Sequence, residues 1–153
     1  MNYIDDEEMY YDIKKHQYIL TPAAMENNYS ISLQDTLDTD GAVDPQAVPQ
    51  MFLRRVSEAV YSYIYLFSTN KRVTEYRISL PEFREGIKEA MMELAYSVLL
   101  TNTDPSLQWS GNNNKPLVVT PSVKSILRRY NLLFRGITWD ITEKELATKG
   151  VDY

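Results

Sequence analysis

Apolar residues recur at steps of three and four in three stretches of the chain, the spacing that puts side chains on one face of an α-helix. The stretches cover residues 45–68, 79–102 and 120–136. Their apolar positions are Phe52, Val56, Ala59, Val60, Tyr63, Ile64 and Phe67, then Phe83, Ile87, Ala90, Met91, Leu94, Ala95 and Val98, and finally Val123, Ile126, Leu127, Tyr130, Leu133 and Phe134. The pattern predicts three main helices.

Each of these stretches opens with a residue that favours a helix start. Asp44 can accept hydrogen bonds from exposed amides, and Pro45 after it loses nothing in a first helical turn. Ser79 and Glu82 have the spacing of a capping box. Thr120 precedes a proline in the same way at the third stretch. These signals place the helix starts more firmly than periodicity alone.

The remaining segments predict a small amount of extended structure. HQYILT, residues 16–21, favours a strand, and residues 26–45 mix apolar alternation with turn formers. In residues 105–120, two apolar stretches flank SGNNN, which favours a hairpin or a projecting loop. The closing stretch ITWDITEKELATKGVDY begins like a strand and ends polar.

The fold class that we predict is therefore mainly α with minor β: a small bundle of about three helices with short strands or a hairpin. A length of 153 residues fits one domain. We divide it into an acidic, extended N-terminal arm at 1–44, a helical core at 45–140 with a loop or hairpin near 105–120, and a C-terminal tail at 141–153.

The charge pattern supports this division. The net charge is −5, but residues 1–50 carry ten acidic residues against two lysines, while the rest carry eleven acidic against fourteen basic. The opening MNYIDDEEMYYD is typical of a solvated arm. Its tyrosines leave a docking segment open as the alternative, because tyrosine combines a large contact area with a polar tip.

The composition restricts the chemistry that the chain can perform. There is no cysteine, which excludes disulfides, thiol nucleophiles and thiolate zinc sites, and His16 is the single histidine. No nucleophile motif or glycine-rich elbow lies near His16, so we interpret it as structural. No P-loop, dinucleotide, metalloprotease or kinase motif occurs, and no apolar run could span a bilayer. We expect no enzyme, cofactor or metal, and name no catalytic residue.

Charged side chains on the second and third helices suggest pairing between two faces. Glutamates recur at steps of three and four on the second helix, and basic residues project from the third. The glutamates are Glu82, Glu85, Glu89 and Glu93, and the basic residues are Lys124, Arg128 and Arg135 with Arg129 on the flank. Two alternatives remain: a hydrolase that uses these carboxylates, and a small helical regulatory module that binds nucleic acid through Arg54, Arg55, Lys124, Arg128 and Arg129.

The first helix is apolar on more than one side. Tyr61 and Tyr65 lie on another face than its main stripe, together with Leu53, and Leu66 adds a further apolar position. Such a helix is either deeply buried or shared with a neighbouring subunit, and we favour self-association because tyrosine is common at interfaces. The interface candidates are Phe52, Tyr61, Tyr65, Glu89, Trp109 and Arg128.

Three segments carry a resemblance to a known family: YYDIKKHQYILTPAAM, FLRRVSEAVYSYIYLF and FREGIKEAMMELAY. In style and order they resemble the small head-tail connector proteins, also called adaptor, neck or head completion proteins, of tailed bacteriophages. The resemblance implies a mostly helical structural virion protein that is assembled in the host cytoplasm. The sequence departs from the family pattern in its long acidic opening of about 44 residues.

The partners that the resemblance implies follow from the position of such proteins in the neck. The subunits would form a homo-oligomeric ring, with the dodecameric symmetry of the portal, beneath the portal protein. The ring would dock the tail or further neck proteins and extend the DNA channel. Genomic DNA would pass through without sequence-specific binding, and no membrane would be involved.

Overall fold

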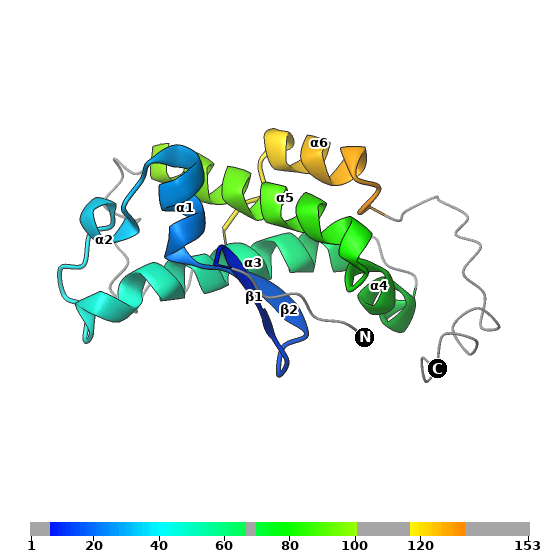
Figure 1. Ribbon diagram of the computed structural model, residues 1–153, viewed down its shortest axis with the longest axis horizontal. Helices are drawn as coiled ribbons and strands as arrows, with labels where there is room; N and C mark the ends of the chain where they lie inside the picture. Colours follow the sequence, from blue (N-terminus) through cyan, green and yellow to red (C-terminus); the bar gives the residue numbers. More distant parts are fainter. Residues whose placement is uncertain (1–6, 67–69, 101–116, 134–153) are drawn as a thin grey trace.

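The structure is a computed structural model that describes residues 7–66, 70–100 and 117–133, and it is mainly helical with a short antiparallel hairpin near the N-terminus (Figure 1). The predicted fold class is thereby confirmed. The elements are β1 (Met9–Asp12), β2 (Gln17–Leu20), α1 (Pro22–Tyr29), α2 (Leu33–Thr36), the 3-10 helix η1 (Pro45–Ala47), α3 (Val48–Leu66), α4 (Lys71–Ile78), α5 (Pro81–Leu100) and α6 (Pro121–Arg129).

Helix α5 lies at the centre of the molecule. It packs between α3 and α6, with α4 at its N-terminal end and α1 near its C-terminal half (Figure 1). Its buried apolar residues are Phe83, Ile87, Ala90, Met91, Leu94 and Ala95. They match the stripe that periodicity predicts, and they join side chains from α3 and α6 in one hydrophobic core.

Helix α3 completes the small β-sheet. The two strands pair in antiparallel register, with Tyr11 opposite Tyr18 and Met9 opposite Leu20. In this register the backbone groups of residues 18 and 20 point away from β1, because antiparallel strands alternate the direction of their hydrogen bonds. Side chains of α3 bond to three of these groups: the Tyr18 amide, the Tyr18 carbonyl and the Leu20 carbonyl.

Two of these contacts are short and buried. The Tyr18 amide donates to the Tyr61 hydroxyl at 2.9 Å, and the Ser57 hydroxyl donates to the Tyr18 carbonyl at 2.6 Å. The third is longer, from the Gln50 amide group to the Leu20 carbonyl at 3.4 Å. Steps of seven and four place the three α3 residues on one face. Since an isolated two-stranded hairpin is marginal in water, this face holds the sheet in place.

The prediction of an extended N-terminal arm at 1–44, separate from the core, is wrong for the residues that the structure describes. Strands β1 and β2 and helices α1 and α2 contribute buried side chains to the same core as α3 and α5. These side chains include Met9, Tyr18, Leu20, Met25 and Leu33. Acidic and amide residues between these apolar positions make the apolar pattern hard to recognise in the sequence. For the same reason residues 26–45 were predicted to be extended, although they include the second half of α1 and all of α2.

An ion pair connects the residue before β1 to the central helix α5. The Lys88 ammonium group lies 2.5 Å from a Glu8 carboxylate oxygen, and Asn27 and Asn28 donate to the second oxygen. The hydrogen bond from Lys88 holds the pKa of Glu8 below its usual value, against the opposing effect of burial. Glu8, the last residue of the acidic run, is therefore neutralised within the fold.

Helix α6 ends earlier than its sequence pattern predicts. It stops at Arg129, and Asn131 adopts the left-handed conformation with φ 58°. The Leu132 amide then bonds to the Leu127 carbonyl, which closes the helix end. Here α6 lies close to α5, because a Cβ atom on Gly86 would come within 2.6 Å of Tyr130. Helix α4 was not predicted.

The predicted loop or hairpin at 105–120 lies mostly outside the described residues. Only its last part is described, and residues 117–120 are extended without a strand partner among the described residues. The predicted tail at 141–153 also lies outside the described residues.

Replacing Tyr61 by Phe removes the acceptor of the buried Tyr18 amide while it keeps the ring in the core. We expect a loss of about 1–3 kcal/mol in the free energy of unfolding, measured by urea denaturation followed by circular dichroism. Tyr65→Phe is the matched control, since the Tyr65 hydroxyl makes no hydrogen bond within the described residues. Equal losses in the two variants would contradict the role of Tyr61.

Replacing Lys88 by Met removes the partner of Glu8 and keeps an apolar stem of similar length. The lowered pKa of Glu8 means that the ion pair stabilises the fold above the ordinary glutamate pKa of about 4.5 and is lost as the pH falls through the folded-state value. We expect the variant to lose about 1–2 kcal/mol at pH 7, and the difference from the parent chain to narrow as the pH falls below the ordinary value of 4.5.

Lys15→Met is the control for this experiment, because the Lys15 to Glu58 pair is exposed on both sides and contributes little. A Lys88→Met deficit that does not change with pH would show that the apolar stem, and not the charge, supports the contact.

Candidate functional site

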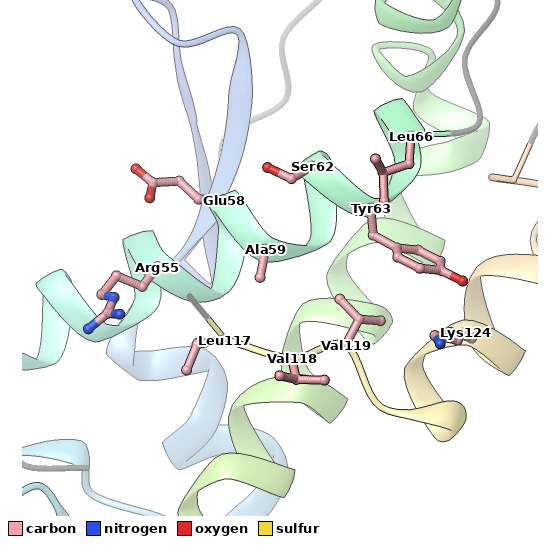
Figure 2. Close-up of a pocket in the computed structure, with 10 residues that line it drawn as sticks. All are labelled: Arg55, Glu58, Ala59, Ser62, Tyr63, Leu66, Leu117, Val118, Val119 and Lys124. Carbon is pink, nitrogen blue, oxygen red and sulfur yellow. The ribbon is translucent and has the colours of Figure 1, made fainter. Parts of the chain in front are cut away.

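An open groove runs along one side of α3. It has a volume of about 510 Å³ and lies between α3, the extended segment 117–119 and the first turn of α6 (Figure 2). The lining residues are Arg55, Glu58, Ala59, Ser62, Tyr63, Leu66, Leu117, Val118, Val119 and Lys124. Residues distant in sequence thus form one continuous surface feature.

The apolar part of the groove is exposed. Leu66, the last residue of α3, is 76% exposed, and Val118 is 80% exposed. Ala59 and Tyr63 are half-buried and point from α3 towards segment 117–119 (Figure 2). Exposed large apolar side chains that gather in one groove are characteristic of surfaces that bind another molecule.

The groove occupies a third face of α3. One face of this helix closes the edge of β2, and another packs against α5 in the core. The groove face carries Ala59, Tyr63 and Leu66, at steps of four and three. Two faces of α3 are therefore covered by the described residues, and the third, on which Ala59, Tyr63 and Leu66 lie beside polar residues, is open.

The backbone of segment 117–119 is unpaired. It belongs to no helix or described strand, Thr120 at its end has extended backbone angles, and no hydrogen bond within the described part of the chain uses a backbone group of Leu117, Val118 or Val119. Leu117 and Val119 are half-buried while Val118 faces outward, the alternation of a β-strand. The groove thus has the properties of an open strand edge beside an apolar helix face.

The rim of the groove is mainly basic. Arg55 and Lys124 contribute positive charge, and the Lys124 ammonium group lies 5.3 Å from the centre of the Tyr63 ring. The single carboxylate of the lining, Glu58, is contacted by Lys15 at 2.7 Å. Burial lowers the pKa of the Arg55 guanidinium group, and Glu58 opposes this effect.

The structure places the predicted interface residues in different environments. Phe52 and Tyr61 are fully buried in the chain's own core, so their assignment to a contact between subunits is wrong. Tyr65 is half-buried beside Tyr61, with its ring 6.5 Å from that of Tyr61, and burial raises its pKa. Arg128 is exposed on α6, and Trp109 lies outside the described residues.

The sequence correctly indicated that the face of α3 with Tyr61 is apolar. We assigned this face to a contact with another subunit, whereas β2 of the same chain covers it. Periodicity shows that the face is apolar and cannot show whether a sheet of the same chain or another subunit covers it. The sequence did not predict that the residues of the groove face form one surface. Its signal in the sequence was Leu66, an apolar position outside the main stripe, but segment 117–119 becomes its neighbour only in the folded chain.

The predicted pairing between α5 and α6 is confirmed, within one chain. Glu89 forms an ion pair with Arg129, on the flank of α6, rather than with the predicted Arg128. The Tyr130 hydroxyl donates to the second Glu89 oxygen at 2.6 Å, and this bond raises the pKa of Tyr130. Glu89 therefore orients the end of α6.

The alternative functions gain no geometric support from these contacts. Three of the basic residues proposed to bind nucleic acid already have partners in the chain. Arg54 lies 3.7 Å from Asp12, Arg129 pairs with Glu89, and the Lys124 ammonium group lies over the ring of Tyr63. The carboxylate proposed for hydrolysis at position 89 is already held by two partners.

His16 occupies the turn between β1 and β2. It has φ 54°, the left-handed conformation, and lies 3.7 Å from Glu75. This position in a tight turn suits the structural role that the sequence suggests.

Three further observations bear on the function of the chain. The described residues contain no cluster of His, Cys, Asp or Glu suited to a metal ion. Among the described helices, none has the length and apolar character needed to cross a bilayer. Comparisons with protein-family models, curated proteins and solved structures found no match to this chain.

Replacing Glu89 by Gln weakens the acceptor of the Tyr130 hydroxyl. We expect the pKa of Tyr130 to fall towards the ordinary tyrosine value of 10.0, measured by NMR titration of the chain with labelled tyrosine. The parent hydrogen bond requires the protonated phenol, so its contribution to stability is present below the ordinary pKa and is lost as the pH rises through the raised value.

Glu93→Gln is the control for this titration. Burial raises the pKa of Tyr29 and the charge of Glu93 raises it further, whereas Glu93 is not among the groups that shift the pKa of Tyr130. We therefore expect this variant to lower the Tyr29 value and to leave Tyr130 unchanged. A Tyr130 pKa that is the same in Glu89→Gln and in the parent chain would exclude the hydrogen bond.

Proposed function

We propose that the chain is a structural, non-enzymatic subunit of a tailed-bacteriophage neck, a head-tail connector that acts by self-association and docking. The observation that carries this proposal is the third face of α3, an apolar groove with Leu66 and Val118 exposed in it. Covering this groove with another subunit removes apolar surface from water, and each Å² of apolar surface buried contributes a favourable free energy of roughly 25 cal/mol. The groove thus provides a driving force for assembly.

The position of the groove suits a ring. It lies on one side of the chain, so a contact between the groove of one copy and a different surface of the next is a heterologous contact. Such contacts repeat around an axis and close when the rotation permits. The proposed assembly is a homo-oligomeric ring with the dodecameric symmetry of the portal.

The sequence resemblance is compatible with the fold. The described residues of its three segments, 10–25, 52–66 and 83–96, lie in the hairpin with α1, in α3 and in α5. These are elements that share the hydrophobic core. The resemblance therefore concerns the part of the chain that determines the fold, rather than an exposed loop.

The electrostatics are compatible with a DNA channel that does not bind its contents. The net charge is −5, and several of the basic side chains are already paired with carboxylates of the same chain. Strong phosphate binding needs basic groups that can replace counterions. In the proposed virion role, the genome passes through the ring while the protein contacts are made to the portal and to the tail or further neck proteins, after assembly in the host cytoplasm.

Native mass measured over a range of protein concentrations tests this proposal. We expect the parent chain to form oligomers as the concentration rises in sedimentation velocity, and Leu66→Asp to shift this assembly to at least about tenfold higher concentration. Leu66 is exposed, so the variant is expected to keep its fold, which circular dichroism checks.

Leu100→Asp is the matched control. Leu100 is the last residue of α5, as Leu66 is of α3, and it is 65% exposed but does not line the groove. A parent chain that stays monomeric at every concentration would contradict self-association. Assembly that is lost equally in both variants would show that general surface hydrophobicity, and not the groove, is responsible.

A further inference from the structure

We propose that the occupant of the α3 groove is the segment 137–141 of a second copy, bound as a β-strand beside residues 117–119. This inference rests on the proposed self-association and names the two surfaces that would meet. The receiving surface is described by the structure, and the donor is identified by its sequence pattern.

The receiving surface has the two properties that a strand needs. Segment 117–119 is extended and offers backbone groups without partners among the described residues. Beside it, Ala59, Tyr63 and Leu66 form an apolar floor on α3 (Figure 2). In strand addition, backbone hydrogen bonds contribute affinity, while pockets for alternate side chains contribute specificity.

The donor has the matching pattern. Residues 137–141 read ITWDI, so Ile137, Trp139 and Ile141 fall on one side of an extended chain, and Thr138 and Asp140 on the other. The apolar side suits the floor of the groove, and tryptophan is a frequent anchor residue of interfaces.

Charge supports the same pairing. The donor and the residues after it, at 137–146, carry three acidic side chains and one lysine. The rim of the groove presents Arg55 and Lys124 against one carboxylate, Glu58, which Lys15 contacts. Opposite charges at the rim of an interface fix its register and speed association more than they add affinity.

The length of the connection favours a donor from another copy. The described part of the chain ends at Leu133, beyond the C-terminal end of α6, while segment 117–119 directly precedes the N-terminal end of α6. A nine-residue helix is about 13.5 Å long. The four steps from Leu133 to Ile137 can span at most about 14 Å, so a donor from the same chain would need a fully extended connection to reach even the N-terminal end of α6.

Mixing two defective variants of the full chain tests the inference. Trp139→Asp damages the donor and leaves the groove intact, and Val118→Asp damages the groove and leaves the donor intact. We expect each variant alone to lose self-association by at least about tenfold in dissociation constant. An equimolar mixture should form heterodimers and stop there, because only one intact contact remains.

A matched substitution controls for the added charge. Val43→Asp changes a valine that is 99% exposed and does not line the groove. We expect this variant to assemble like the parent chain.

Tryptophan fluorescence reports directly on the donor. In a Trp109→Phe chain, Trp139 is the single tryptophan. We expect its emission to move to shorter wavelength as the concentration rises, and the added Val118→Asp substitution to abolish this shift.

The outcomes separate this inference from the proposed function. If Leu66→Asp impairs assembly and Trp139→Asp does not, the connector proposal stands and the groove takes another occupant, such as residues 1–6 or the groove of a second copy. A short emission wavelength at every concentration, in a monomer, would show that the donor binds its own chain and would overturn both proposals.

Discussion

The outer edge of β2 must be covered, and α3 covers it with side chains rather than with a third strand. Tyr61 and Ser57 bond to the two backbone groups of Tyr18, both in the buried interior. Unpaired backbone groups at this depth would cost about as much as the hydrogen bonds contribute, so the rotation of α3 about its axis is restricted. Once this face is fixed, the stripe with Phe52 and Val56 meets α5, and the face with Tyr63 and Leu66 forms the groove.

The main helices could be predicted from sequence because each has a long apolar stripe and a recognisable start. Asp44 and Thr120 cap as expected, with backbone amides of Gln46 and Val123 as donors. In the described part of the N-terminal 44 residues, the strand predicted at 16–21 corresponds to β2, but β1, α1 and α2 were not predicted, because they are short and lie among polar and acidic side chains. The ion pair from Glu8 that neutralises part of this charge connects residues 80 positions apart.

The candidate site was only partly predictable for a related reason. The sequence shows that the first helix is apolar on several sides, but Tyr61 is covered by β2 and Leu66 is not covered by the described residues. Both positions are apolar and lie outside the main stripe, so the spacing of apolar residues cannot show which of them is covered. The groove also needs residues 117–119, which no local pattern connects to α3. What remains open after folding is apolar surface and extended backbone, whereas several charged groups, Glu89 among them, already have partners.

The closing of the β2 edge also determines the order in which the chain can become stable during synthesis. Translation proceeds from the N-terminus, so the hairpin leaves the ribosome before the residues that complete it. The Tyr18 amide cannot form its hydrogen bond until Tyr61 has been synthesised, 43 residues later. Glu8 cannot form its ion pair until Lys88 has been synthesised, 80 residues later. Until then the hairpin is a pair of short strands with one uncovered edge, the kind of surface at which nascent chains pair wrongly. Residues 1–50 carry ten acidic side chains against two lysines, and this shared negative charge opposes association between neighbouring nascent chains during the interval.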